Sequence, residues 1–132
     1  MRPLRIHNAR LLCPASGLDA PGALVVQGGR IAAIGADAAM EGAPGACDEL
    51  DAGGAVLCPG LVDLRARVGE PGAEHRESIA SAAQAAAAGG VTTICVPPDT
   101  DPVLDDPALV EWLARRGEAT RAVTLLPIAA AT

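Results

Sequence analysis

The chain has 132 residues, a length that suits one ordinary domain. Half of the residues are hydrophobic, so the chain can form a core and we do not expect global disorder. Acidic residues number 16 and basic residues 10, which gives a formal charge of -6. That balance argues against a nucleic-acid partner, because binding to phosphates requires a basic surface.

The sequence carries no membrane or export signal. No apolar run approaches the roughly 20 residues of a membrane span, and no apolar signal core follows the charged residues at the N-terminus. We therefore expect a cytoplasmic protein without membrane contact. The cysteines form no C-x-x-C pair, so we expect no zinc knuckle or redox motif. We expect reduced and mostly buried thiols at Cys13, Cys47, Cys58 and Cys95.

The first 55 residues alternate short β-prone runs with turn-forming residues, which predicts a small all-β unit. Its clearest feature is a hairpin over residues 23–35 whose arms meet at Gly28 and Gly29, a pair that suits a two-residue turn. The other expected pieces are a strand over residues 4–12, a loop over 15–22 and a second loop over 36–49.

Beyond residue 55 the pattern changes to alternating strands and helices. Residues 55–64 are strongly apolar and predict a strand buried on both faces, as in a parallel sheet. A helix is expected over residues 74–88, ended by Gly89 and Gly90, one of them in a left-handed conformation. Its apolar stripe is predicted to comprise Ile79, Ala82, Ala83, Ala86 and Ala87.

A second helix is expected to begin after an N-cap at Asp106, with Pro107 in its first turn, and to end at Gly117. Further strands are expected over residues 91–96 and 122–128. The order β-α-β-α-β predicts a parallel α/β layer over residues 56–132.

Several short motifs in this second part follow one another in a specific order: residues 59–64 (PGLVDL), 70–72 (EPG), 74–79 (EHRESI), 85–93 (AAAAGGVTT) and 98–102 (PDTDP). In these motifs the chain resembles the dihydroorotase family of the amidohydrolase superfamily. The resemblance implies an α/β fold in which a partial β-sandwich (residues 1–55) is followed by the first βα units of a TIM-like (β/α)8 metal-dependent hydrolase barrel (residues 56–132).

The family resemblance implies a zinc hydrolase that closes carbamoyl aspartate to dihydroorotate in pyrimidine biosynthesis. Its chemistry uses an H-x-H pair at the end of the first barrel strand, where residues i and i+2 point the same way and reach one ion. In this sequence the two positions are Arg65 and Arg67. An arginine side chain stays protonated and has no lone pair for a metal. We therefore expect no metal or other cofactor here, although zinc serves active family members.

The substrate site that the resemblance implies is altered too. The family's arginine two residues after the second histidine is replaced by Gly69, and its asparagine after the second strand is replaced by Asp99. The negative charge of Asp99 would repel a substrate carboxylate. The chain contains no lysine, so no carbamylated-lysine bridge can form within it, and the family's other ligands would lie beyond Thr132. We predict no catalytic residue in this chain.

The remaining candidate ligands are expected to be structural. Asp63 should bond nearby backbone or pair with an arginine, His75 should be solvated at the start of the first helix, and His7 should belong to a strand. The arginines Arg65 and Arg67 have three options: to bind an anionic metabolite, to pair with carboxylates of a partner, or to fill the emptied site. We favour the last, by pairing with Asp63, Glu70 or Asp99.

Three functions are consistent with this sequence. The first is a non-catalytic dihydroorotase-like protein of pyrimidine biosynthesis, with a structural or regulatory role alongside aspartate carbamoyltransferase. The second is an active zinc cyclic amidohydrolase with a rebuilt site. The third is a truncated fragment without independent function. We favour the first, with aspartate carbamoyltransferase as the expected partner and self-association into a homo-oligomer as the other interaction.

Overall fold

The computed structural model describes residues 2–36, 38 and 47–131. The chain divides into two compact units, Met1–Pro59 and Gly60–Thr132. No helix in the described part of the chain is long and apolar enough to cross a membrane.

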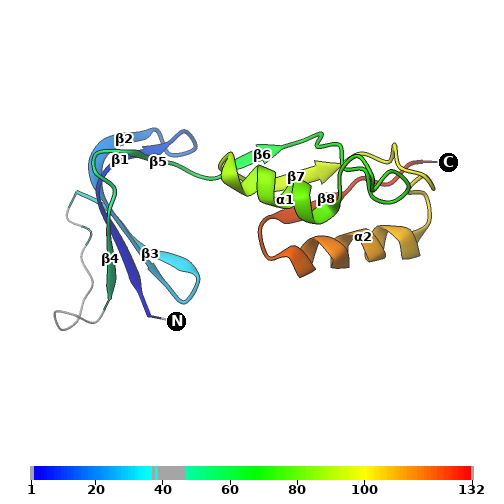
Figure 1. Cartoon of the computed structure of the whole chain (residues 1–132). Helices are drawn as coiled ribbons and strands as arrows, with labels where there is room; N and C mark the ends of the chain where they lie inside the picture. Colours follow the sequence, from blue (N-terminus) through cyan, green and yellow to red (C-terminus); the bar gives the residue numbers. More distant parts are fainter. Residues whose placement is uncertain (1, 37, 39–46, 132) are drawn as a thin grey trace. The chain divides into compact units, whose positions relative to one another are not determined.

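The first unit is a β-sheet built around β1 (Leu4–Cys13), the blue strand of Figure 1. Antiparallel pairing joins β1 to β2 (Leu18–Gln27), and β2 to β3 (Arg30–Gly35). Parallel pairing joins β1 to β4 (Asp48–Asp51) and β5 (Val56–Leu57). An apolar cluster of Ala9, Leu11 and Leu24 forms the main core of this unit.

The predicted hairpin is confirmed, because Gly28 and Gly29 both have positive φ angles (59° and 75°) and join β2 to β3. The loop predicted over residues 15–22 is too long. Leu18 already pairs with Cys13, so the chain turns within four residues and β2 starts at Leu18. The second predicted loop, over residues 36–49, falls largely outside the described residues, and its last two residues belong to β4.

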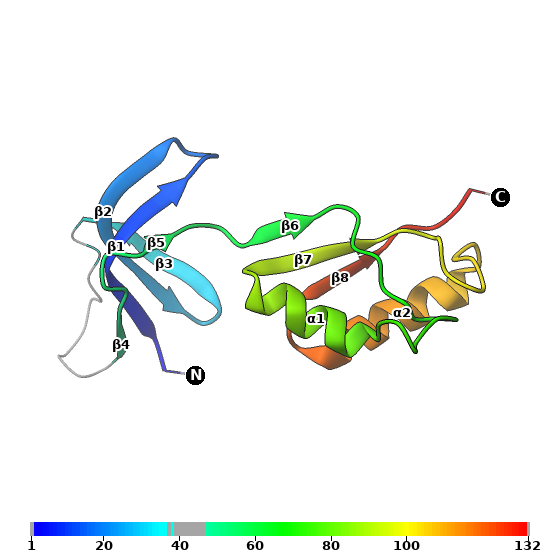
Figure 2. The same cartoon turned by 45° about the horizontal axis from the view of Figure 1, so that its top comes forward.

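The second unit is a parallel sheet in the order β6-β7-β8, with both helices on one of its faces (Figure 2). The strands are β6 (Leu61–Asp63), β7 (Val91–Val96) and β8 (Thr124–Pro127). The helices α1 (Ile79–Ala88) and α2 (Pro107–Thr120) connect them. The predicted β-α-β-α-β order and parallel sheet are confirmed.

The core of the second unit lies between this sheet and its two helices. Every element except β6 places a fully or almost fully buried aliphatic side chain there: Ile79 from α1, Ile94 and Val96 from β7, Leu113 from α2 and Leu125 from β8. Burial of an aliphatic side chain contributes roughly 1.5–3 kcal/mol, so this cluster is what holds the helices to the sheet.

Helix α1 is shorter than predicted. It begins at Ile79 and not at residue 74, because the Ser78 hydroxyl accepts a hydrogen bond from the Ser81 backbone N–H and caps the helix there. Of the predicted apolar stripe, Ile79 and Ala83 are buried but Ala87 is exposed. The left-handed glycine is Gly90, with φ +77°.

Helix α2 has the predicted N-cap, with the Asp106 side chain accepting a hydrogen bond from Ala108 N–H at 2.7 Å. The prediction that Gly117 ends this helix is wrong, since α2 continues to Thr120. Gly117 serves close packing instead: a Cβ there would lie 2.5 Å from the Cβ of Leu125 in β8. The helix crosses the strand where only glycine fits.

The single buried strand predicted over residues 55–64 is wrong. Two short strands replace it, with β5 in the first unit and β6 in the second. Leu61, Val62 and Leu64 are 57%, 56% and 73% exposed. The reason is that β6 is an edge strand, paired only with β7 among the described residues, and both helices lie on one face of the sheet.

The four cysteines are free thiols, but they are not mostly buried as predicted. Cys58 is exposed, and the other three, Cys13, Cys47 and Cys95, are partly exposed. A hydrogen bond with Ser16 is the main cause that lowers the pKa of the Cys13 thiol below its ordinary value.

Candidate functional site

The candidate site lies where β6 and β7 end. Because the two strands are parallel, the segments that follow them start at the same edge of the sheet. Residues 64–78 follow β6 and contain Arg65, Arg67 and Gly69, and residues 97–106 follow β7 and contain Asp99. The topology therefore brings together all four positions that were predicted as degenerate metal or substrate sites.

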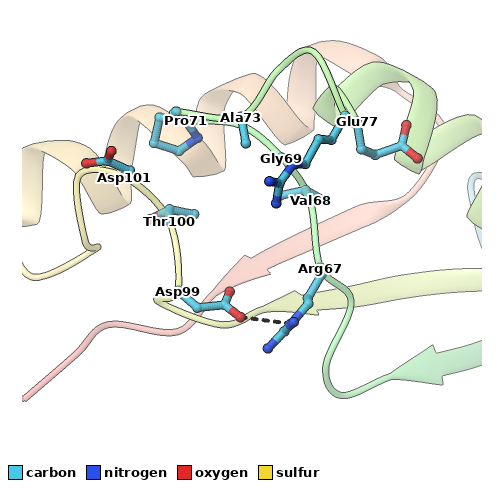
Figure 3. A pocket seen from close by; sticks show the side chains of 11 residues that line it. Arg67, Val68, Gly69, Pro71, Ala73, Glu77, Asp99, Thr100 and Asp101 are labelled. Carbon is cyan, nitrogen blue, oxygen red and sulfur yellow. Dashed lines mark ion pairs between the residues drawn. The ribbon is translucent and has the colours of Figure 1, made fainter.

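The two segments enclose a pocket of about 280 Å³, shown in Figure 3. One wall consists of residues between Arg67 and Glu77, and the other consists of residues 99–101. Arg67 reaches across this pocket, and Gly69 and Asp99 line it. Arg65 does not line this pocket, but together with Asp63 and Arg67 it lines a neighbouring one at the end of β6.

Arg67 and Asp99 face one another and form an ion pair, drawn as a dashed line in Figure 3. The Arg67 Nε lies 2.9 Å from the Asp99 Oδ2. The Arg67 side chain is 73% exposed and that of Asp99 is 39% exposed, so water screens the pair and its stabilisation is on the order of 0.2–1 kcal/mol. Its importance lies in its position, because it joins a residue predicted at a degenerate metal-site position to one predicted at a degenerate substrate-site position.

Asp63 and Arg65 behave differently from this pair. The Asp63 Oδ1 accepts a hydrogen bond from the backbone N–H of Arg65 at 2.9 Å, so Asp63 shapes the turn at the end of β6, which confirms its predicted local role. The guanidinium of Arg65 is exposed and has no ion-pair partner among the described residues. Of the expected pairings, only that of Arg67 with Asp99 forms.

Gly69 lies where the segment after β6 folds back on itself. Ala73 N–H donates a hydrogen bond to the carbonyl oxygen of Gly69, which closes a tight turn. A Cβ at position 69 would lie 2.3 Å from the Ala73 carbonyl oxygen and 2.5 Å from that of Glu77. The turn therefore has no room for any side chain, including the arginine that the family resemblance puts there.

The donor set of this site does not suit a metal ion. The described residues contain no group of three or more His, Cys, Asp or Glu side chains arranged to hold one. His75 is exposed in the segment before α1, and not within the helix as predicted, while His7 belongs to β1 of the first unit. The Glu74 carboxylate accepts hydrogen bonds from the backbone N–H groups of Glu74 itself and of Gly72. These bonds lower the pKa of Glu74 and hold its side chain within the turn.

Glu70 is a site residue whose role the sequence did not reveal. It is 5% exposed and pairs with Arg116 of α2, at 2.7 Å, and not with Arg65 or Arg67. The partners are 46 residues apart in the chain, so no local pattern could have identified them.

The sequence profile described as dihydro-orotase-like matches residues 54–132, the part that contains the pocket. This chain belongs to the dihydroorotase-like family. The family assignment predicted from the motifs is thus confirmed.

Relatives match almost all of the chain. A dihydroorotase-like protein of Pseudomonas aeruginosa is 43% identical over 129 residues, which are 98% of this chain and 30% of that protein. A dihydroorotase of Solibacter usitatus is 36% identical over 130 residues, which are 98% of this chain and 29% of that enzyme. The chain thus spans about 30% of the length of these curated relatives.

A solved structure shows the same fold. The L-hydantoinase (dihydropyrimidinase) of Arthrobacter aurescens superposes with a TM-score of 0.70 at 27% identity, over 89% of this chain and 25% of that enzyme. The dihydroorotase-like chain therefore has the mixed α/β fold of an amidohydrolase, with the opening strands and helices of the barrel.

Proposed function

We propose that this dihydroorotase-like protein is non-catalytic and acts as a structural or regulatory component of pyrimidine biosynthesis alongside aspartate carbamoyltransferase. The observation that carries the proposal is the ion pair between Arg67 and Asp99. It occupies the pocket with two residues that satisfy each other, where an enzyme of this family would hold its metal and its substrate.

The first support concerns the metal. A divalent cation about 4 Å from a water-exposed guanidinium is repelled by roughly 2 kcal/mol at the dielectric constant of water, about 80. Arg65 and Arg67 offer no lone pairs to offset this cost. Asp99, the carboxylate beside them, already accepts the Arg67 guanidinium. The residues present do not suit zinc, so we derive no catalytic step that passes through a metal.

The second support concerns the substrate. A carboxylate entering the pocket meets three acidic side chains, those of Glu77, Asp99 and Asp101, against two arginines, Arg67 and Arg76. The turn at Gly69 has no room for a further arginine that would attract it. The change to Asp99 acts through charge, and the change to Gly69 acts through crowding. Restoring either alone leaves the other in place.

A role beside aspartate carbamoyltransferase requires the scaffold and not the chemistry. The packed α/β layer of the second unit provides such a scaffold, since buried side chains of both helices, β7 and β8 share one core. This packed layer supports the structural role.

The test has two parts on the purified chain. Metal analysis and a dihydroorotase assay are expected to show neither stoichiometric zinc nor turnover, and zinc binding with turnover would refute the non-catalytic role. Mixing with the aspartate carbamoyltransferase of the same source, followed by light scattering, is expected to give a defined heavier complex. A folded chain that forms no complex would refute the partnership.

A further inference from the structure

Glu70 is the buried charged residue of the described chain, with 5% of its surface exposed. Its two neighbours in sequence, Gly69 and Pro71, line the pocket, but Glu70 itself does not. Its side chain therefore points away from the pocket, into the body of the second unit. Burial of a carboxylate is unfavourable unless it is paired and hydrogen-bonded, so its partners identify its role.

The Glu70 carboxylate connects three segments. Its Oε2 accepts a hydrogen bond from the backbone N–H of Ile79, the first residue of α1, at 3.0 Å. Its Oε1 accepts hydrogen bonds from the Nε and Nη2 of Arg116 in α2, at 3.1 and 2.7 Å. The guanidinium of Arg116 lies 5.9 Å from the centre of the Trp112 ring. One carboxylate thus joins the segment after β6 to the start of α1 and to α2.

The segment has few other attachments to the helices, and across the pocket the Pro71 carbonyl accepts a hydrogen bond from the Asp101 backbone N–H at 3.3 Å. Its first part is held by Val68, which is buried in the core, and by a hydrogen bond from Ala66 N–H to the Cys95 carbonyl. Between Val68 and Ile79, Glu70 is the only buried residue. The N-terminus of α1 attracts the negative charge of Glu70, and the guanidinium of Arg116 neutralises that charge.

We infer that Glu70 and Arg116 are positioning residues for the pocket. They hold the turn over residues 69–78 against α2, and this fixes the wall from which Arg67 reaches Asp99. A change on α2 that removes the guanidinium leaves Glu70 buried without a counterion, so the turn must move to give the carboxylate access to water. The pocket is therefore coupled to α2, which does not line it.

The test is backbone hydrogen exchange on the full chain carrying Glu70→Gln, Arg116→Met or Arg116→Lys. The amides of residues 69–78 are expected to exchange at least tenfold faster in Glu70→Gln and Arg116→Met. Lysine keeps the charge but loses the two-pronged contact, so Arg116→Lys should recover part of the protection. The matched control is Arg115→Met, because Arg115 pairs only with the exposed Glu111 among the described residues.

A second readout separates positioning from general destabilisation. The side-chain Nε–H signal of Arg67 in NMR spectra should move in Glu70→Gln towards its place in Asp99→Asn, because both variants disturb the same ion pair. Equal acceleration of exchange in β7 and in residues 69–78, or an unmoved Arg67 signal, would overturn the inference. If Glu70→Gln does not fold, Arg116→Lys against Arg115→Met decides the question by the same two readouts.

Discussion

Substitution of Gly69 by alanine tests the crowding on which the proposed loss of the substrate site depends. The added Cβ would lie 2.3 and 2.5 Å from two carbonyl oxygens, so the turn must open to accommodate it. Overpacking costs about 1–3 kcal/mol, and loss of the hydrogen bond from Ala73 to Gly69 costs about 1 kcal/mol. Alanine also restricts the unfolded state of the variant more than glycine does, which offsets about 0.4–1 kcal/mol of this loss in stability. The net expected loss is about 2 kcal/mol.

The assay is unfolding in urea or by heat, followed by the fluorescence of Trp112. This is the only tryptophan of the chain and it lies in α2, so its signal reports on the second unit alone. For a domain of 60–100 residues, a loss of about 2 kcal/mol lowers Tm by roughly 8–16 °C.

The control is Gly89→Ala, because a Cβ at Gly89 meets nothing closer than 3.5 Å and the backbone there has a negative φ. Its expected change in stability is within about 0.5 kcal/mol or slightly favourable. Equal stability of Gly69→Ala and Gly89→Ala would refute the steric argument, and with it the claim that the turn excludes an arginine.

Three further predictions concern other contacts. Asp106→Ala removes the N-cap of α2 and should lower the free energy of unfolding by about 1 kcal/mol, measured by Trp112 fluorescence. Asp105→Ala lies outside the cap and should leave the stability unchanged, so equal losses would contradict the capping role. A double-mutant cycle on Arg67 and Asp99 should give a coupling below about 1 kcal/mol that fades in 1 M salt, and a larger, salt-resistant value would mean that the pair is shielded from water. Hydrogen bonds from Gly53 N–H and the Asn8 amide lower the pKa of Asp51 from its ordinary value of 3.8. Because the pKa of Asp51 is lower in the folded than in the unfolded state, its contribution to stability is complete above the unfolded-state pKa. That contribution is lost as pH falls through the folded-state pKa. Asp51→Asn should therefore flatten the acid side of the stability curve of the first unit, measured by circular dichroism, and an unchanged curve would contradict this assignment.

The parts of the fold that follow from local chemistry could be predicted from the sequence. The glycine pair at the β2–β3 turn, the β-branched run of β7 and the cap at Asp106 depend on neighbours in the chain, and each lies where its pattern indicates. The end of α2 could not be predicted, because Gly117 is used for contact with Leu125 rather than for a C-cap. The exposure of β6 also depends on what packs beside the strand and not on its own apolar run.

The positions of the candidate site were predicted, and so was one of its contacts, the ion pair between Arg67 and Asp99. The family resemblance indicated these two as altered residues, and parallel strands bring such positions to one edge. The pairing of Glu70 with Arg116 spans 46 residues and two connections, so periodicity and turn chemistry carry no sign of it. The division into residues 1–55 and 56–132 as sandwich and barrel segments remains a prediction.

The crowded turn at Gly69 has a consequence for the history of the site. A histidine at position 65 or 67 requires only a change of an exposed side chain, and the described backbone permits it. An arginine at position 69 requires the turn through Ala73 and Glu77 to widen first, because no rotamer of a side chain relieves a clash at its own Cβ. On the proposed function, the metal position is thus open to point substitution, whereas the substrate position is closed to it until the backbone changes. A chain that carries only the two histidines would offer two of the ligands of a metal site, with no substrate position beside them.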